Sequence, residues 1–133
     1  MEIRTVPFHL IHQNWPKVEA FIASGLMFSE DYTIDQARAL LGQGYWHLVI
    51  AEDGGEIKGA CSIEFSDRAN ARVAVITSIG GRMIVSKQTR FQLEELMKRC
   101  GATKIECSAR PSAARLYSMA GMRQKCIVME SEI

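Results

Sequence analysis

The sequence lacks any pair of cysteines at C-x-x-C spacing, so it offers neither a zinc ribbon nor a dithiol redox motif. Its four cysteines are Cys61, Cys100, Cys107 and Cys126, and each lies in an apolar-patterned segment. This pattern predicts four buried free thiols. Free thiols suit a reducing compartment, and we expect a cytoplasmic protein.

The sequence also lacks an excess of charge of either sign: it has 16 Lys and Arg and 15 Asp and Glu, for a net charge of +1. This balance predicts neither a nucleic-acid nor a membrane partner. No apolar run reaches the length of a membrane span. The first residues, MEIRTVPFHL, lack the basic and apolar regions of a signal peptide, so none is expected.

Repeats, linkers and low-complexity runs are absent as well, and the 133 residues are 47% hydrophobic. A chain of this length buries roughly two-thirds of the surface that its unfolded form exposes. We therefore expect one domain over residues 1–133 with a self-sufficient core.

The first third of the chain alternates one weak strand with two helices. Residues 2–8 alternate as a strand does. Asn14 followed by Pro16 predicts a helix start, and Gly25 predicts its end. Thr33 and Gln36 have the spacing of a capping box for a short second helix that runs through Leu41.

The middle of the chain predicts an antiparallel meander of three strands, at residues 45–52, 56–65 and 72–79. A helix at about 87–100 follows, with Thr89 and Gln92 as its capping box and Gly101 as its stop. A strand at 102–108, a helix at 111–120 and a last strand at 122–130 complete the chain. The order β-α-α-β-β-β-α-β-α-β predicts an α/β (α+β) fold with a mixed, mainly antiparallel sheet flanked by helices.

The stretch ITSIGGRMIVSKQ, residues 76–88, joins a strand to a helix across Gly80 and Gly81. A strand, a glycine break and a helix N-terminus together form a typical anion site, because the helix start offers free N–H groups and a positive dipole end. Alternatively, the two glycines only end the strand and let the chain turn. Both interpretations stay open from the sequence.

The element order resembles the Gcn5-related N-acetyltransferase (GNAT) superfamily over nearly the whole chain. The segment RPSAARLYSMAGM carries the local likeness to the family pattern Asn-x-x-Ala-x-x-x-Tyr-x-x-x-Gly-Phe. Ala113, Tyr117 and Gly121 hold their places, whereas Arg110 and Met122 replace Asn and Phe. The C-terminal half also resembles a divergent GNAT-like group of tailed bacteriophages.

The resemblance implies an acetyl-CoA site between the strands at 72–79 and 102–108. Backbone N–H groups at Ile76 and Ser78 would orient the acetyl carbonyl and stabilise the oxyanion. Tyr117 would act as the general acid that protonates the CoA thiolate. Without the family pattern, Tyr117 would be a half-buried tyrosine that packs on the sheet.

The family's pyrophosphate loop, Arg/Gln-x-x-Gly-x-Gly/Ala, falls on residues 82–87. Arg82 keeps the first position, whereas larger residues hold both glycine positions. Arg82 and Lys87 could supply charge and Ser86 a hydroxyl donor. Gly80 and Gly81 lie about five residues too early to replace the loop glycines directly.

The general base has two candidates. Glu64 is the best carboxylate near the third meander strand, and His47 lies one strand farther away. Either could equally be structural: Glu64 as an exposed strand residue, His47 as a satisfied histidine. The loop at 27–32 mixes apolar and acidic residues, which suits a cationic amine or a protein contact.

Two functions follow from these residues. The first is N-acetyl transfer from acetyl-CoA to an unknown amine. The second is a catalytically inactive GNAT-fold protein of bacteriophage morphogenesis or the virion, found in the host cytoplasm or the particle. A protein partner or a homo-oligomer is compatible with either, because fold alone does not decide function.

Overall fold

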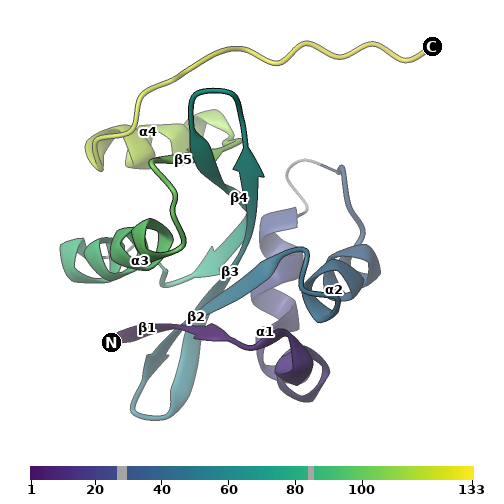
Figure 1. The fold of residues 1–133 in the computed structure, drawn as a ribbon, viewed down its shortest axis with the longest axis vertical. Coiled ribbons are helices and arrows are strands. Elements are labelled where there is room, and N and C mark those ends of the chain that lie inside the picture. Colours follow the sequence, from purple (N-terminus) through teal and green to yellow (C-terminus); the bar gives the residue numbers. More distant parts are fainter. Residues whose placement is uncertain (27–29, 84–85) are drawn as a thin grey trace.

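The computed structural model describes residues 1–26, 30–83 and 86–133 of the chain. Figure 1 shows how its strands and helices are arranged. The elements are β1 (Glu2–Val6), the 3-10 helix η1 (Phe8–Leu10), α1 (Ile11–Leu26), α2 (Ile34–Gly42), β2 (His47–Asp53), β3 (Glu56–Asp67), β4 (Arg72–Gly81), α3 (Lys87–Arg99), β5 (Lys104–Cys107) and α4 (Pro111–Met119). Up to α4, this is the order predicted from the sequence.

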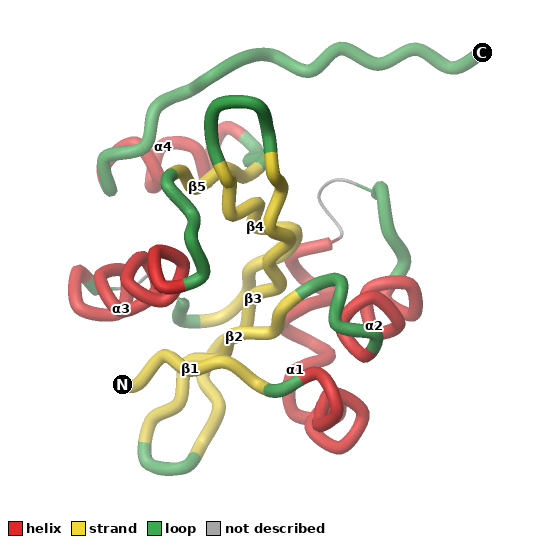
Figure 2. The backbone as a smooth tube through the Cα atoms, in the orientation of Figure 1, coloured by secondary structure: helices red, strands yellow, loops and turns green. Residues whose placement is uncertain are grey.

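The strands form one sheet in the order β1-β2-β3-β4-β5 (Figure 2). Neighbours from β1 to β4 pair antiparallel, and β4 pairs with β5 in parallel. The meander of β2, β3 and β4 was predicted by its tight turns. The mixed, mainly antiparallel sheet is confirmed.

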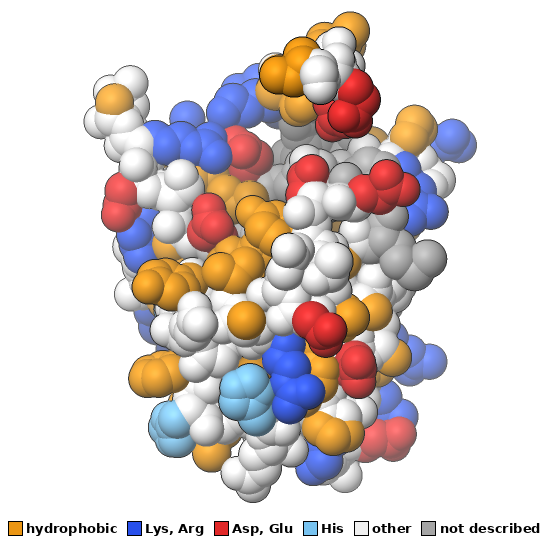
Figure 3. Space-filling model, turned by 90° about the vertical axis from the view of Figure 1, so that its right-hand side faces the viewer, with side chains coloured by type: hydrophobic (Ala, Val, Ile, Leu, Met, Phe, Trp, Pro, Cys, Tyr) orange, Lys and Arg blue, Asp and Glu red, His pale blue; other side chains and the backbone are white. Residues whose placement is uncertain are grey.

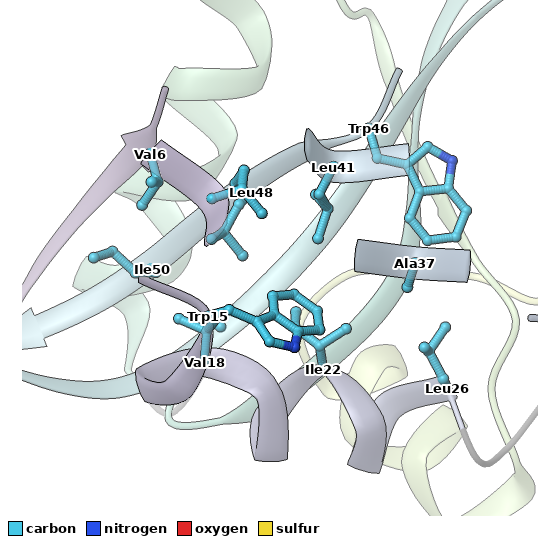
Figure 4. Close-up of a cluster of buried hydrophobic side chains, with 12 residues drawn as sticks. Val6, Trp15, Val18, Ile22, Leu26, Ala37, Leu41, Trp46, Leu48 and Ile50 are labelled. Carbon is cyan, nitrogen blue, oxygen red and sulfur yellow. The ribbon is translucent and has the colours of Figure 1, made fainter. Parts of the chain in front are cut away.

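Helices cover both faces of this sheet, and each face has its own hydrophobic core. On one face, α1 and α2 pack against alternate residues of β1, β2 and β3 (Figure 4). Trp15, Val18 and Ile22 of α1 meet Leu48 and Ile50 of β2 there. On the other face, side chains of β2, β3 and β4 meet residues of α3, among them Leu93, Leu96 and Met97. Alternation along each strand divides the apolar residues between the two cores.

The predicted start of the first helix was wrong in detail. α1 begins at Ile11 because η1 runs directly into it, and Pro16 lies inside the helix. The Asn14 side chain donates to the Leu10 carbonyl at 2.9 Å, so it does not cap the helix. The Thr33–Gln36 capping box of α2 is confirmed.

At α3 the capping box is formed by Ser86 and Thr89, three residues before the predicted pair. Gln92 contacts a different element, because its side-chain oxygen accepts a hydrogen bond from the Ile3 N–H at 3.0 Å. Gln92 therefore ties α3 to β1, the far edge of the sheet. A bond between residues so distant in sequence leaves no local pattern to predict it.

The predicted last strand at 122–130 is not formed, and residues 123–133 carry no helix or strand. A strand needs a neighbour for its backbone groups, and this segment has none within the described chain. The prediction of four buried thiols is also wrong. Only Cys61 is buried; Cys107 is half-buried, and Cys100 and Cys126 are exposed. Among the described residues, no helix is long and apolar enough to cross a membrane.

Candidate active site

A β-bulge lies in the middle of β4. Ser62 of β3 is paired with Ser78 and Ile63 with Ile76, so Thr77 is the extra residue on β4. A bulge of this kind turns two successive side chains to the same side. The hydroxyls of Thr77 and Ser78 both reach the buried Ser62 hydroxyl, at 2.6 and 2.7 Å. These three hydroxyls hold the bulge in place beneath α1.

The parallel ladder between β4 and β5 ends at this bulge. Its last residue pair is Ile76 with Cys107, whereas β4 continues for five more residues to Gly81. Beyond Ile76, the β5 side of β4 has no strand neighbour in the described chain. The parallel pairing therefore ends beside the bulge, and the backbone groups of β4 beyond it have no strand partner on this side among the described residues.

Tyr117 of α4 lies near this point of separation. The phenol is partly buried, and this burial is the main cause that raises its pKa. Charge interactions with Cys107 and Cys61 raise the pKa of Tyr117 further. Tyr117 is thus protonated at neutral pH and can donate a proton near the end of β5.

The two thiols beside Tyr117 are poor nucleophiles. Full burial raises the pKa of Cys61 to about 12. Burial, followed by the charge of Glu106, also raises the pKa of Cys107. Because the thiolate is the reactive form of cysteine, neither thiol is set up for covalent catalysis.

Glu64 lies on the opposite face of the sheet from Tyr117's neighbours. It pairs with Val75, one residue before Ile76, and its carboxylate accepts a hydrogen bond from the Trp46 indole at 2.9 Å. Trp46 is buried in the core beneath α1 and α2, and the Tyr32 ring meets its edge at 4.8 Å between centroids. The carboxylate is oriented by this donor and lies one strand away from the bulge.

His47 lies elsewhere, and the structure does not bring it together with Glu64. It is on the α3 face, two strands from Ile76 through Ile63, which is about 10 Å at ordinary strand spacing. Its ring contacts Phe65, with 5.2 Å between centroids. Partial burial, followed by the nearby charge of Arg72, lowers the pKa of His47.

Gly80 and Gly81 lie in tight packing contacts with the backbone of neighbouring elements. A Cβ on Gly80 would collide with the Phe21 carbonyl of α1, and one on Gly81 would collide with the Lys58 carbonyl of β3. Gly81 also has φ 71°, which favours glycine. Both glycines allow close backbone contact inside the protein. This role agrees with the interpretation that they end the strand and let the chain turn, rather than with an anion site.

Polar groups at and before the start of α3 also form hydrogen bonds within the protein. Ser86 accepts the Thr89 N–H at 3.1 Å as its cap, and the Arg82 N–H donates to the Lys58 carbonyl at 3.0 Å. Met83 is fully buried in the core beneath α3. The exposed Lys87 is the first residue of α3, where backbone N–H groups have no acceptor within the helix. Ile84 and Val85, which fill two predicted loop positions, lie outside the described residues.

No protein-family model matches the sequence, and no curated protein matches it. Solved structures do match it. A probable acetyltransferase is 14% identical over 100% of this chain and 97% of its own, with a TM-score of 0.69. The ribosomal-protein-alanine N-acetyltransferase from Brucella melitensis biovar Abortus 2308 is 14% identical over 99% and 98%, with a TM-score of 0.68. The aminoglycoside acetyltransferase meta-AAC0020 from an uncultured soil metagenomic sample, in complex with sisomicin, is 10% identical over 99% and 95%, with a TM-score of 0.69.

The chain has a GNAT-like fold. The likeness to these acetyltransferases is one of fold, and the GNAT-like resemblance seen in the sequence is confirmed at that level. In this GNAT-like fold, the bulge lies beside the end of the parallel ladder at Cys107, and the charge of Cys107 acts on Tyr117. This place is the candidate active site.

A second surface lies on the face covered by α1 and α2, where Figure 3 shows acidic side chains interspersed with basic ones. Tyr32 lines two shallow depressions in this part of the structure. Asp31 borders the first and Glu30 the second. Met27, Phe28 and Ser29 of the predicted acceptor loop lie outside the described residues.

The sequence analysis missed three residues of the site. Ser62 and Thr77 complete the hydroxyl cluster, and Trp46 orients Glu64. Two adjacent hydroxyl residues in an otherwise apolar strand, Thr77 and Ser78, were a local signal for a bulge. The described residues hold no group of His, Cys, Asp and Glu that could bind a metal ion.

Proposed function

We propose that this GNAT-like protein transfers an acetyl group from acetyl-CoA to an amine. The observation that carries the proposal is the end of the parallel ladder at Ile76 and Cys107, beside the bulge and close to Tyr117. In this proposal, the backbone groups of β4 without a strand partner and the protonated phenol of Tyr117 act on the same acetyl group. The matched structures described as acetyltransferases share the fold that builds this place.

Acetyl-CoA supplies an activated acetyl thioester. Backbone N–H groups of β4 at and after Ile76 would bind the acetyl carbonyl and stabilise the oxyanion that forms on it. The amine nitrogen forms the new bond to the acetyl carbon, and the bond from that carbon to sulfur breaks. Tyr117 gives its proton to the leaving thiolate. Glu64 takes the proton that the amine loses.

Glu64 is the better base because of where it lies. It is one strand away from the bulge, on the face of α1 and α2, whereas the neighbours of Tyr117 lie on the face of α3. An acid on one side and a base on the other suit direct transfer between two substrates that enter from opposite faces. His47 lies on the acid's face and farther from β4, so we assign it no part in the reaction.

The binding of the pyrophosphate would differ from the family pattern. Gly80, Gly81 and Ser86 are used in packing and capping. Lys87, the first residue of α3, and Arg82, five residues earlier in the chain, remain, and both are exposed. Two cations beside a helix N-terminus fit an anion through charge. We therefore propose charge-based binding by Arg82 and Lys87, with weak affinity.

The acceptor proposed for this site is a cationic amine. Tyr32 lines both depressions beside Glu30 and Asp31, and its ring touches Trp46, which holds Glu64. This arrangement connects two acidic side chains to the proposed base through two aromatic rings. Acidic side chains attract the protonated amine during approach. The ammonium then releases one proton to solvent, so that its neutral nitrogen can attack, and Glu64 takes the second proton during the transfer.

Calorimetric titration with acetyl-CoA tests the first step. We expect binding that Arg82→Ala and Lys87→Ala each weaken, because each removes one charge from the pyrophosphate site. Lys98→Ala, at the other end of α3, is the matched control and should bind like the wild type. Release of CoA thiol with a panel of cationic amines then tests the transfer. No binding at millimolar acetyl-CoA would contradict the proposal.

The alternative is a catalytically inactive GNAT-like protein with a structural role, such as a component of phage assembly or of the virion. Buried Met83 favours it, because this residue occupies a position at which the family pattern expects an open loop. Under this alternative the chain binds a protein partner, and acetyl-CoA gives neither heat nor a rise in melting temperature.

A further inference from the structure

Trp46 lies directly before β2 and is held by contacts of both its backbone and its ring. Its backbone N–H donates to the Leu40 carbonyl of α2 at 3.2 Å. Its side chain is 1% exposed and belongs to the core cluster that includes Ala37 and Leu41 of α2 (Figure 4). The Tyr32 ring meets the indole edge to face, at 78° and with 4.8 Å between centroids. These contacts fix both the position and the orientation of the indole.

This fixed indole carries one polar group, its Nε1–H. An indole N–H donates a hydrogen bond and accepts none. Trp46 donates it to Oε2 of Glu64 on β3, at 2.9 Å. A glutamate side chain, by contrast, has several rotatable bonds and loses much rotamer freedom when it is held in place. The hydrogen bond therefore gives the half-buried Glu64 a defined orientation that its own side chain does not provide.

The second carboxylate oxygen of Glu64, Oε1, is left for a ligand. Among the described residues, no hydrogen bond reaches Oε1 and no ion pair involves Glu64. Glu52 and Glu106, by comparison, each bind an arginine. An ionised carboxylate oxygen without a donor keeps its lone pairs for an incoming proton. Glu64 thus combines one oxygen that is held with one that is open.

A purely structural role for this pair would not require a carboxylate. The buried indole N–H needs an acceptor, because a buried donor without one is costly. A neutral amide oxygen would satisfy the donor and would avoid a half-buried charge. The charged acceptor instead lies opposite Val75 of β4, next to Ile76, where we place the acetyl group. This choice of residue fits a base whose geometry has to be fixed.

We propose that Trp46 is a positioning residue for the transfer: its N–H holds Oε2 of Glu64, so that Oε1 takes the proton that the amine loses. The inference rests on the proposed acetyl transfer and adds the residue that fixes the geometry of the base. Trp46 touches no reacting atom in this assignment and acts through Glu64. Such positioning matters because a displacement of about 1 Å can lower a rate about 100-fold.

A double-mutant cycle on kcat tests this role. Trp46→Phe removes the N–H and keeps an aromatic ring, and kcat should fall by about 10-fold or more while the KM for acetyl-CoA stays within about two-fold. Trp15→Phe is the matched control. It makes the same change in the same core, where the Trp15 ring lies beneath the Arg38 guanidinium, and kcat should stay within about two-fold. In the Glu64→Gln background, Trp46→Phe should lower kcat no further, because both changes act through one carboxylate.

The cycle separates positioning from a packing effect. A loss of kcat that adds to that of Glu64→Gln, or one no larger than in Trp15→Phe, would overturn the inference and leave the proposed transfer intact. A wild type that releases no CoA thiol would instead contradict the transfer and, with it, the inference.

A second substitution covers the case in which Trp46→Phe does not fold. The benzothiophene analogue of tryptophan at position 46 keeps the bicyclic shape and lacks only the N–H donor. It should lower kcat by about 10-fold or more, as the phenylalanine variant does, with little change in melting temperature. Wild-type kcat with this analogue would show that the N–H has no part in the reaction, and the proposal would be wrong.

Discussion

Gly80 of β4 lies directly against the carbonyl of Phe21 in α1, with no room for a Cβ between them. The same part of β4 touches α1 at Gly25, where a Cβ would lie 2.9 Å from that of Ser78. Helix and strand therefore pack backbone to backbone at the end of β4. This contact, rather than phosphate binding, accounts for Gly80 in the structure.

Gly80→Ala should accordingly destabilise the protein even without any ligand. We expect a loss of about 3 kcal/mol in the free energy of unfolding, because a methyl group forced into a close-packed contact displaces backbone. Urea denaturation measures it. Gly54→Ala is the control: its Cβ would meet nothing within 4 Å, and φ 58° alone should cost about 1–2 kcal/mol. A smaller loss at Gly80 than at Gly54 would contradict the packing argument.

Tyr117→Phe should lower kcat of the proposed transfer by about 100-fold or more, the usual contribution of a general acid. Because burial raises the pKa of Tyr117 above its ordinary value of 10, the wild-type rate should fall only at a pH higher than 10. The variant should lose that alkaline decline. The rate of CoA thiol release as a function of pH checks both. Leu116→Ala, on the exposed side of α4, should keep the wild-type profile.

Glu64→Gln and His47→Gln should differ sharply. Glu64→Gln keeps a side-chain oxygen for the Trp46 indole but removes the base, so kcat should fall about 100-fold with little change in melting temperature. His47→Gln should leave kcat within about two-fold, because the ring lies across the sheet beside Phe65. The reverse order of the two effects would make His47 the base and refute the assignment of Glu64.

Glu106 makes the stability of the folded protein depend on pH in the acidic range. Hydrogen bonds from Arg68, followed by Lys125, lower the pKa of its carboxyl from an ordinary 4.5 to about 2. A carboxyl with a lowered pKa in the folded state stabilises it above pH 4.5, and the contribution is lost as pH falls from about 4.5 to about 2. Melting temperatures over this range should decline less for Glu106→Gln. Glu94→Gln should decline like the wild type, and equal slopes for Glu106→Gln would contradict the role of Glu106.

Local patterns predicted much of the fold because the signals act within a few residues. The turn at Gly54 and Gly55, the capping box at Thr33 and the stop at Gly101 depend only on nearby backbone geometry. The start of α1 and the cap of α3 were missed because more than one residue could fill each position. At α1, η1 runs directly into the helix. At α3, Ser86 and Thr89 form the cap, and Gln92 bonds to Ile3 instead.

The candidate site was predicted only in part, for the same reason. Tyr117 was named as a candidate through its pattern, and its role stays a prediction. A site between the strands β4 and β5 was expected from the resemblance. That Glu64 and His47 point to opposite faces depends on the register of β2 with β3, which their sequence positions alone leave undecided. The hydroxyl cluster at Ser62 depends on a bulge that shifts the register of β3 with β4 by one residue.

The sequence by itself determined the element types, the meander and the class of fold, because side-chain periodicity and turn chemistry are local properties. Tertiary structure alone decided what Gly80 and Gly81 do, since their use depends on α1 and β3 passing within contact distance. It also decided the fate of residues 122–130. Their pattern favours a strand, but a strand forms only where another strand offers its edge, and the described chain places none beside them.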